Sequence, residues 1–77
     1  MDNKVYIQDG GYYAKSALAP GEWAMRWWGS DQQKMTFKRS GDHNCELKKH
    51  YDSLYVVPIR WIPTGYPLTL AYGAGDK

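Results

Sequence analysis

The sequence holds one cysteine among its 77 residues, Cys45, so no disulfide can form within the chain. Small secreted domains usually depend on disulfides, and the lack of a second cysteine favours a reducing compartment. No apolar run approaches the roughly 20 residues of a membrane-spanning helix. The opening stretch, MDNKVYIQDG, contains no long apolar segment of the kind that a signal peptide requires. We therefore expect a single cytoplasmic domain over residues 1–77, with no membrane contact.

A strong charge imbalance is also missing. Ten Lys and Arg stand against eight Asp and Glu, which gives a formal net charge of +2. This composition lacks the basic excess that is typical of a nucleic-acid-binding domain. The local balance is less even, because residues 34–50 carry five Lys and Arg against two Asp and Glu. The charge pattern therefore predicts at most a local basic surface.

Motifs for catalysis or metal binding are scarce. His43, Cys45 and His50 form the pattern H-x-C-x4-H, whose spacing matches no established zinc site. Cys45 with either histidine is the one pair with the chemical types of a nucleophile and a base, and no third group orients it. The glycines of Asp9-Gly10-Gly11 and Gly73–Gly75 precede no predicted helix, so they do not form a phosphate-binding loop. We therefore predict a protein that is not an enzyme and that binds neither a metal nor a cofactor.

Aromatic residues are abundant instead. Four Trp, seven Tyr and one Phe make up 16% of the chain. A domain of this size buries only roughly 60% of the surface of its unfolded chain, so its stability margin is thin. Each aromatic side chain buries roughly 150–250 Å², so a few of them suffice for a small core. The aromatic residues outnumber what such a core needs, and a surplus of exposed rings is typical of a contact surface.

Alternating side chains over Glu22–Arg39 (EWAMRWWGSDQQKMTFKR) predict a β-hairpin whose turn lies at Gly29–Gln33. Successive residues of a strand point to opposite faces, so the hairpin has one apolar and one solvated face. The predicted core face carries Trp23, Met25, Trp27, Met35 and Phe37. The opposite face carries Arg26, Trp28, Lys34, Thr36 and Lys38. The adjacent Trp27 and Trp28 cannot enter one core together, so one of them must face solvent or a partner.

Further strands are expected on both sides of this hairpin. Asp9-Gly10 favours a type I′ turn between strands at Lys4–Gln8 and Tyr12–Lys15. Cys45–Asp52 fits either a strand or a short helix, and its strand-like surroundings favour the strand. Short strands separated by frequent turns predict a mostly β fold. We expect a small antiparallel barrel or sandwich of five to seven short strands, with or without one short helix.

Strands are also predicted in the C-terminal third of the chain. Leu54–Ile62 has apolar residues on both faces, as a central strand does. Pro58 cannot donate a backbone hydrogen bond, so we expect it to move this strand to an edge or a bulge. Leu68–Tyr72 is the last predicted strand, with Leu68, Leu70 and Tyr72 facing inward, and residues 73–77 form a flexible tail.

The solvated face of the predicted hairpin combines aromatic and basic side chains. Tryptophan, tyrosine and arginine are the residues that most often anchor protein interfaces. We predict a non-enzymatic small binding protein that docks on a larger macromolecule, most of all a protein, and modulates or inhibits it. Phages and mobile elements encode accessory inhibitors of this kind. The expected contact residues are Trp28, Arg26, Lys34, Lys38 and Tyr6, with Tyr55 and Trp61 if their strand lies at an edge.

Alternatives stay open at this point. The same face suits a single-stranded nucleic acid, since bases stack on aromatic rings with roughly 1–3 kcal/mol per base. A small nucleotide-like ligand, or assembly into a homo-oligomer, would use such a surface as well. Trp28 could also simply cover Arg26 or a lysine side chain through a cation–π contact. The salt dependence of the affinity distinguishes a nucleic acid from a protein partner. Nucleic-acid binding releases counterions, so its affinity falls steeply as the salt concentration rises.

Overall fold

The computed structural model of the chain describes residues 4–75, which form seven short strands and one short helix. Strand and isolated-bridge residues make up 42% of the described residues, so the predicted mostly β fold with one short helix is confirmed. None of the sheets closes into a barrel. The elements are β1 (Val5–Gln8), β2 (Gly11–Ala14), β3 (Met25–Trp27), α1 (Asp31–Thr36), β4 (Lys38–Arg39), β5 (Cys45–His50), β6 (Ser53–Pro58) and β7 (Thr69–Leu70).

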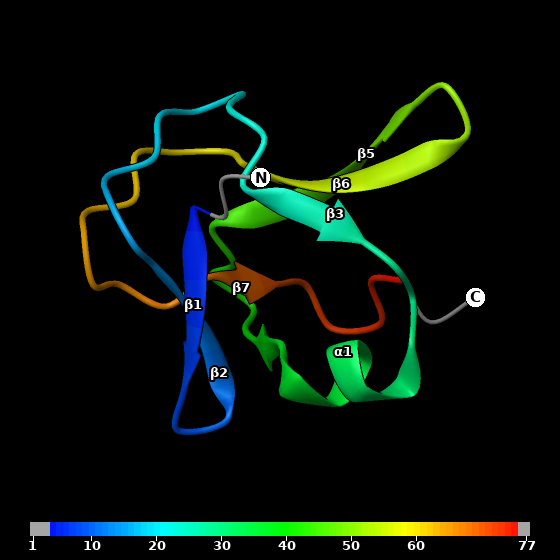
Figure 1. The fold of residues 1–77 in the computed structure, drawn as a ribbon, viewed down its shortest axis with the longest axis horizontal. Coiled ribbons are helices and arrows are strands. Elements are labelled where there is room, and N and C mark those ends of the chain that lie inside the picture. Colours follow the sequence, from blue (N-terminus) through cyan, green and yellow to red (C-terminus); the bar gives the residue numbers. More distant parts are fainter. Residues whose placement is uncertain (1–3, 76–77) are drawn as a thin grey trace.

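Three small sheets share one core (Figure 1). β1 and β2 form an antiparallel hairpin, and β3, β6 and β5 form an antiparallel sheet in that order. β4 and β7 form a parallel ladder of two residues on each strand, and in Figure 1 β7 lies between the hairpin and the larger sheet. Every sheet contributes to one buried apolar cluster, which includes Val5, Trp27, Phe37, Val56 and Leu70.

The β1–β2 hairpin has the predicted turn. Asp9 and Gly10 take φ values of 51° and 72°, the left-handed conformations that a type I′ turn requires. Gln8 and Gly11 face each other across this two-residue turn. The observed strands agree with the predicted ones to within one residue, because this turn depends on neighbouring residues alone.

The predicted hairpin over residues 22–39 is wrong. β3 pairs with β6, and the helix α1 takes the place of part of the expected turn and the first part of the expected return strand. The helix begins after Ser30, whose hydroxyl oxygen accepts a hydrogen bond from the Gln33 N–H over 3.2 Å. This contact satisfies one of the N–H groups that the first turn of a helix leaves without a partner. The helix turns Met35 away from the core, and this side chain is 85% exposed.

Two of the five predicted core residues of that hairpin are fully in the core. Trp27, 6% exposed, and Phe37 are buried, and their rings meet edge to face at 5.7 Å. Trp23 is exposed, contrary to the prediction, because it precedes β3 and its ring stacks on Tyr55 instead. Trp28 is 66% exposed, so the prediction that the adjacent tryptophans face opposite ways is confirmed.

Residues 45–52 adopt the strand alternative. β5 pairs with β6 through a two-residue turn in which Tyr51 takes a φ of 56°. The pattern of hydrophobic residues had fitted a helix as well, and the pairing with the neighbouring strand β6 makes this segment a strand. The tight turn places His50 opposite Ser53 and aligns the two strands over their full lengths.

Pro58 does not displace its strand. β6 is the central strand of its sheet, so the prediction of an edge or a bulge is wrong. The pair His50–Ser53 closes a two-residue turn and is therefore hydrogen-bonded, after which bonded and non-bonded pairs alternate along the ladder. By this alternation Pro58 and Cys45 form a non-hydrogen-bonded pair. The missing N–H of proline thus interrupts no bond between β5 and β6.

The last strand, β7, is shorter than the predicted Leu68–Tyr72. Leu68 and Leu70 are fully buried, as their alternation predicts. Tyr72 was expected to face inward and is exposed, because the strand ends at Leu70 and a turn follows.

Arg39 fixes the chain that follows β7. Its Nη1 donates to the carbonyl oxygens of Ala71 over 3.0 Å and of Ala74 over 2.6 Å. Ala74 also packs against the core cluster. Ala74, which lies in the predicted flexible tail at residues 73–77, therefore has defined contacts, and residues 76–77 lie outside the described residues.

Gln33 is the one buried polar residue among residues 4–75. Its Oε1 accepts hydrogen bonds from the N–H groups of Trp28 over 2.6 Å and of Gly29 over 3.1 Å. Its Nε2 donates to the carbonyl oxygen of Arg26 over 3.1 Å. The amide therefore takes the place that a neighbouring strand would have at the outer edge of β3. Buried polar groups that lose their partners destabilise a fold, so the Gln33 amide and these backbone groups depend on one another.

We expect Gln33→Ala to lower the free energy of unfolding by about 2 kcal/mol, because three backbone groups lose their partner. In a domain of this size, the midpoint of thermal unfolding should fall by roughly 10 °C, measured by circular dichroism. Gln32→Ala is the matched control, since Gln32 is the exposed neighbour on the same helix. Its midpoint should stay within about 3 °C of the wild type. Equal midpoints for the two variants would show that the Gln33 amide contributes nothing to stability.

Candidate functional site

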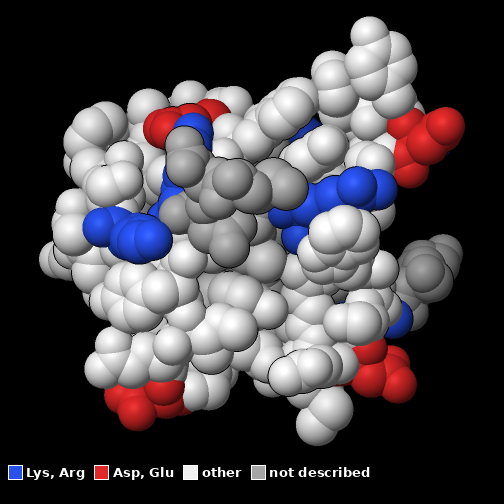
Figure 2. Space-filling model, viewed as in Figure 1, with Lys and Arg blue, Asp and Glu red and all other residues white. Residues whose placement is uncertain are grey.

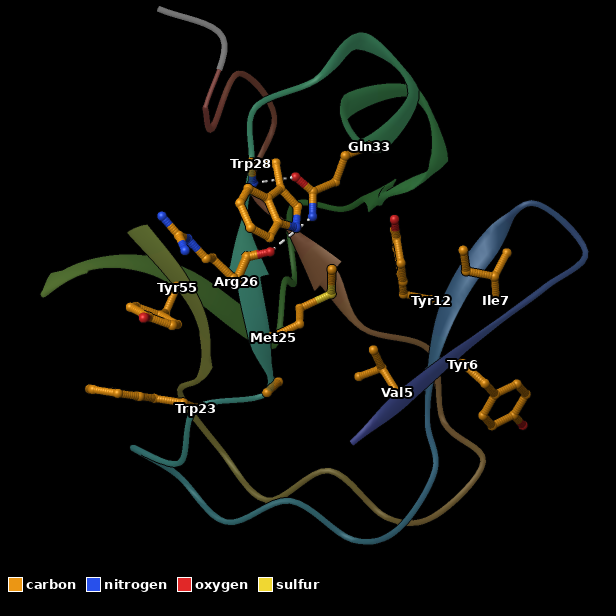
Figure 3. A pocket seen from close by; sticks show the side chains of 11 residues that line it. Val5, Tyr6, Ile7, Tyr12, Trp23, Met25, Arg26, Trp28, Gln33 and Tyr55 are labelled. Carbon is orange, nitrogen blue, oxygen red and sulfur yellow. Dashed lines mark hydrogen bonds between the residues drawn. The ribbon is translucent and has the colours of Figure 1, made fainter. Parts of the chain in front are cut away.

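A hollow of about 750 Å³ lies between the β1–β2 hairpin and β3 (Figure 3). Ligand-binding clefts of proteins commonly have volumes of roughly 300–1,000 Å³. We call this space the β1–β3 hollow. β1 lines it with Val5, Tyr6 and Ile7, β2 with Tyr12, and β3 with Met25 and Arg26.

The walls of the hollow are mainly apolar. Val5 of β1 and Met25 of β3 point towards each other across it in Figure 3. Tyr12 packs its ring on Phe37 with 4.7 Å between the centroids. Burial raises the pKa of Tyr12 above its usual value, so the phenol stays neutral at physiological pH. The hollow therefore offers apolar contact together with few polar groups.

Arg26 and Trp28 form a stacked pair at the hollow. The guanidinium carbon of Arg26 lies 4.3 Å from the centroid of the Trp28 ring, which is a cation–π contact. The backbone beneath the pair is fixed, because Gln33 binds the Arg26 carbonyl and the Trp28 N–H. The cation–π contact that was the alternative interpretation of Trp28 is thus present, and it leaves most of the Trp28 ring exposed.

The described lining residues of the hollow carry charge of one sign only. Arg26 is the one charged residue among the described residues that line it. On the face drawn in Figure 2 most of the surface is uncharged, and the acidic side chains lie near its periphery. An anionic group that entered the hollow would meet a cation and no carboxylate of the lining.

A second, more open hollow of about 530 Å³ adjoins the same pair of side chains. Arg26 and Trp28 line both hollows. Lys34 of α1 and Asp52 of the β5–β6 turn add charges of opposite sign to the second one. The mixed charges make this space less selective for an anion than the β1–β3 hollow.

An aromatic cluster lies next to the β1–β3 hollow. The rings of Trp23 and Tyr55 stack at 4.5 Å with an interplanar angle of 15°. His50 packs on Trp23 with 4.5 Å between the ring centroids. Trp23 and Tyr55 both line the hollow, so stacked aromatic surface continues from it towards the β5–β6 turn.

The structure brings together part of the predicted contact set. Trp28, Arg26, Tyr6 and Tyr55 all line the β1–β3 hollow. The remaining predicted residues lie elsewhere. Lys34 lines the second hollow, and Lys38 is half-buried with its side chain over Gly11. Trp61 is exposed and lines neither hollow.

The sequence interpretation missed several lining residues. It placed Trp23 and Met25 in the core and Gln33 in a turn. The spacing of Ser30 and Gln33 was an available signal, because S-x-x-Q is typical of a capping box at the start of a helix. No comparable signal marks Ile7, which lines the hollow because of how two sheets are placed.

An ion pair connects the two sides of the hollow near its N-terminal end. The Lys4 ammonium, just before β1, lies 2.6 Å from Glu22 Oε2, a few residues before β3. Glu22 Oε1 also accepts a hydrogen bond from the Ala19 N–H over 2.9 Å. The hydrogen bond from Lys4 and that from Ala19 lower the pKa of the Glu22 carboxyl. These contacts hold the start of β1 against the chain that leads into β3.

Cys45 and His50 lie far apart in the structure. Cys45 is fully buried, and burial raises the pKa of its thiol to about 12. His50 lies at the opposite end of β5 and contacts Trp23. Within residues 4–75 no three His, Cys, Asp or Glu side chains come together as a metal site would require.

The chain matches no model of a known protein family and no curated protein. Residues 4–75 contain one helix, α1, which has six residues. No helix in this part of the chain is long and apolar enough to cross a membrane. Functional assignment therefore depends on the geometry of the chain itself.

We expect Glu22→Gln to reduce thermal stability at pH 7 and to matter less in acid. The folded-state pKa of Glu22 is lowered, so its contribution is present above the unfolded-state pKa of about 4.3 and is lost as the pH falls through the folded value. The pair is partly exposed, so the loss at pH 7 should be a few degrees in the unfolding midpoint. Melting curves of both proteins should converge towards pH 3. A constant difference between pH 7 and pH 3 would contradict this role.

We expect Cys45 to resist thiol reagents in the folded protein. A buried thiol with a pKa of about 12 forms almost no thiolate at pH 8. Absorbance with Ellman's reagent should therefore show slow labelling in buffer, and one thiol per chain in denaturant. Rapid labelling of the folded protein would mean that Cys45 is accessible and ionised.

Proposed function

We propose that the chain is a non-enzymatic binding domain that docks on a protein partner through the β1–β3 hollow. Arg26 and Trp28 form the anchor, and occupation of a surface on the partner modulates or inhibits it. The observation that carries the proposal is the stacked Arg26–Trp28 pair, whose exposed ring adjoins a largely apolar hollow of about 750 Å³. A cytoplasmic location and a kinship with accessory inhibitors of phages and mobile elements are further parts of this proposal.

The physical basis is the preorganisation of the anchor. Tryptophan and arginine dominate the binding energy of protein interfaces when a partner removes them from water. Here the backbone of both residues is fixed by Gln33, and the two side chains already contact each other. Less conformational entropy is therefore lost when a partner covers them. Tyr6 and Tyr55 extend the contact surface at low entropic cost.

A protein partner fits the arrangement better than a single-stranded nucleic acid. Nucleic-acid surfaces combine aromatic platforms with a groove of cations that follows the backbone. The structure spreads the expected cations apart, since Lys38 covers Gly11 and Arg39 binds the carbonyls of Ala71 and Ala74. Arg26 is the single cation of the larger hollow.

We expect Trp28→Ala to fold normally and to bind its partner at least about thirtyfold more weakly, the effect of losing a dominant anchor. The matched control is Trp61→Ala, because Trp61 is similarly exposed and lines neither hollow. Tagged wild type and both variants are used for capture from lysate of the source or host cell, with mass spectrometry as the readout. Each variant's unfolding midpoint is checked by circular dichroism.

One stoichiometric protein should be captured by wild type and Trp61→Ala and lost with Trp28→Ala. Nuclease treatment and raised salt should leave this capture unchanged. Capture that vanishes with nuclease would replace the proposal by nucleic-acid binding. Equal capture by Trp28→Ala and the wild type would overturn the Arg26–Trp28 anchor.

A further inference from the structure

The outer edge of β1 borders the β1–β3 hollow and offers a way of binding that side chains alone do not provide. Building on the proposed function, we infer that the partner contributes an extended acidic segment, which adds to the free edge of β1 as a further strand. Its backbone bonds to Val5 and Ile7, and one of its carboxylates pairs with Arg26.

The register of the hairpin shows which backbone groups face outward. Gln8 and Gly11 flank a two-residue turn and form a hydrogen-bonded pair. Hydrogen-bonded and non-hydrogen-bonded pairs alternate in an antiparallel ladder. Tyr6 therefore bonds to β2, whereas the N–H and C=O groups of Val5 and Ile7 point away from it.

The opposite side of the hairpin confirms this alternation. Ile7 faces Tyr12 and Val5 faces Ala14 in the register, so the backbone groups of these two β2 residues must also point out of the hairpin. Two hydrogen bonds show that they do. The Tyr12 carbonyl oxygen accepts from the Leu68 N–H over 2.8 Å, and the Ala14 N–H donates to the Tyr66 carbonyl oxygen over 2.9 Å. β2 thus uses its outer edge within the fold. No described strand uses the outer edge of β1, which is exposed at Ile7 and close to the core at Val5.

The outer edges of β3 and β5 are protected, and that of β1 is not. The Gln33 amide covers the outer edge of β3. β5 carries Glu46, Lys48 and Lys49, and charged side chains discourage pairing at an edge. Val5–Gln8 contains no charge, Ile7 is 62% exposed, and β1 pairs with β2 alone among residues 4–75. Such an edge favours the addition of an extended peptide.

The positive charge of Arg26 in the hollow favours an acidic segment as the occupant. The hollow beside β1 contains the cation Arg26 and no acidic residue in its lining. A segment with Asp or Glu complements this charge, and it also avoids like-charge contact. A second copy of the chain fits less well, because its own Val5–Gln8 brings no carboxylate and its own Arg26 adds a like charge. Strand addition further requires alternating side chains, so apolar residues that enter the hollow should alternate with outward polar ones.

The experiment begins with a display library of linear peptides of about ten residues, selected on the full chain. Enriched peptides should alternate β-branched or aromatic residues with polar ones, and they should contain Asp or Glu. Their affinities are then measured for Ile7→Pro and Ile7→Ala. Proline removes the outward N–H of Ile7, which the β1–β2 ladder does not use, whereas alanine removes the side chain and keeps the N–H.

We expect Kd for the selected peptides to be about tenfold higher with Ile7→Pro than with Ile7→Ala, as for one lost hydrogen bond. Thermal unfolding of both variants establishes that each is folded. If Ile7→Pro does not fold, peptides with N-methyl groups at alternate positions test the same bonds on the wild type. Methylation of the alternate residues whose N–H groups face β1 should then weaken binding about tenfold. Methylation of the residues between them should not. Arg26→Gln should abolish the preference for Glu over Gln in these peptides.

The absence of enriched peptides, or equal affinity for folded Ile7→Pro and Ile7→Ala, would overturn strand addition. Sedimentation that shows a dimer of the chain, dissociated by Ile7→Pro, would overturn it in favour of a second copy. A partner whose capture depends on Trp28 but survives Ile7→Pro would overturn strand addition and leave the proposed function intact. Capture that is independent of Trp28 would instead overturn the proposed function itself.

Discussion

The side-chain amide of Gln33 is the contact on which the arrangement of this domain depends. It bonds to the Arg26 carbonyl on one side and to the N–H groups of Trp28 and Gly29 on the other. A single side chain therefore ends the edge of β3, turns the chain into α1 and fixes the backbone beneath the Arg26–Trp28 pair. Stability and the candidate binding surface are coupled here, because the contact that satisfies the buried backbone also presents the anchor.

Local patterns in the sequence predicted what depends on neighbouring residues. Asp9-Gly10 specified the first hairpin, because positive φ at both central positions is a requirement that few residue pairs meet. Trp27 and Trp28 face opposite ways, as the alternation of strand residues predicted, although β3 ends at Trp27 and its partner strand is not the expected one. The mostly β fold was predictable for the same reason, since frequent turns and short alternating runs are local properties.

The errors arose where two structures share one local pattern. Residues 34–38 alternate as a strand does, yet the preceding Ser30 and Gln33 favour the start of a helix, and the capped helix α1 is what forms. The pairing of β3 with β6 joins segments far apart in the sequence, and periodicity contains no information about it. Both errors also affected the prediction of the candidate site. Arg26 and Trp28, which were predicted to share a face, do line one hollow, whereas Trp23 was assigned to a core that it does not enter.

The open edge of β1 limits how strongly strand pairing alone can hold a partner. β1 has four residues, and two of them, Val5 and Ile7, direct backbone groups outward. Two residues offer four hydrogen-bonding groups, each of net value about 0.5–1.5 kcal/mol, before the entropy lost on association is subtracted. So short an edge also carries little risk of aggregation. Affinity and selectivity must therefore come from contacts beside the strand, and the Arg26–Trp28 pair lies in the hollow that this strand borders.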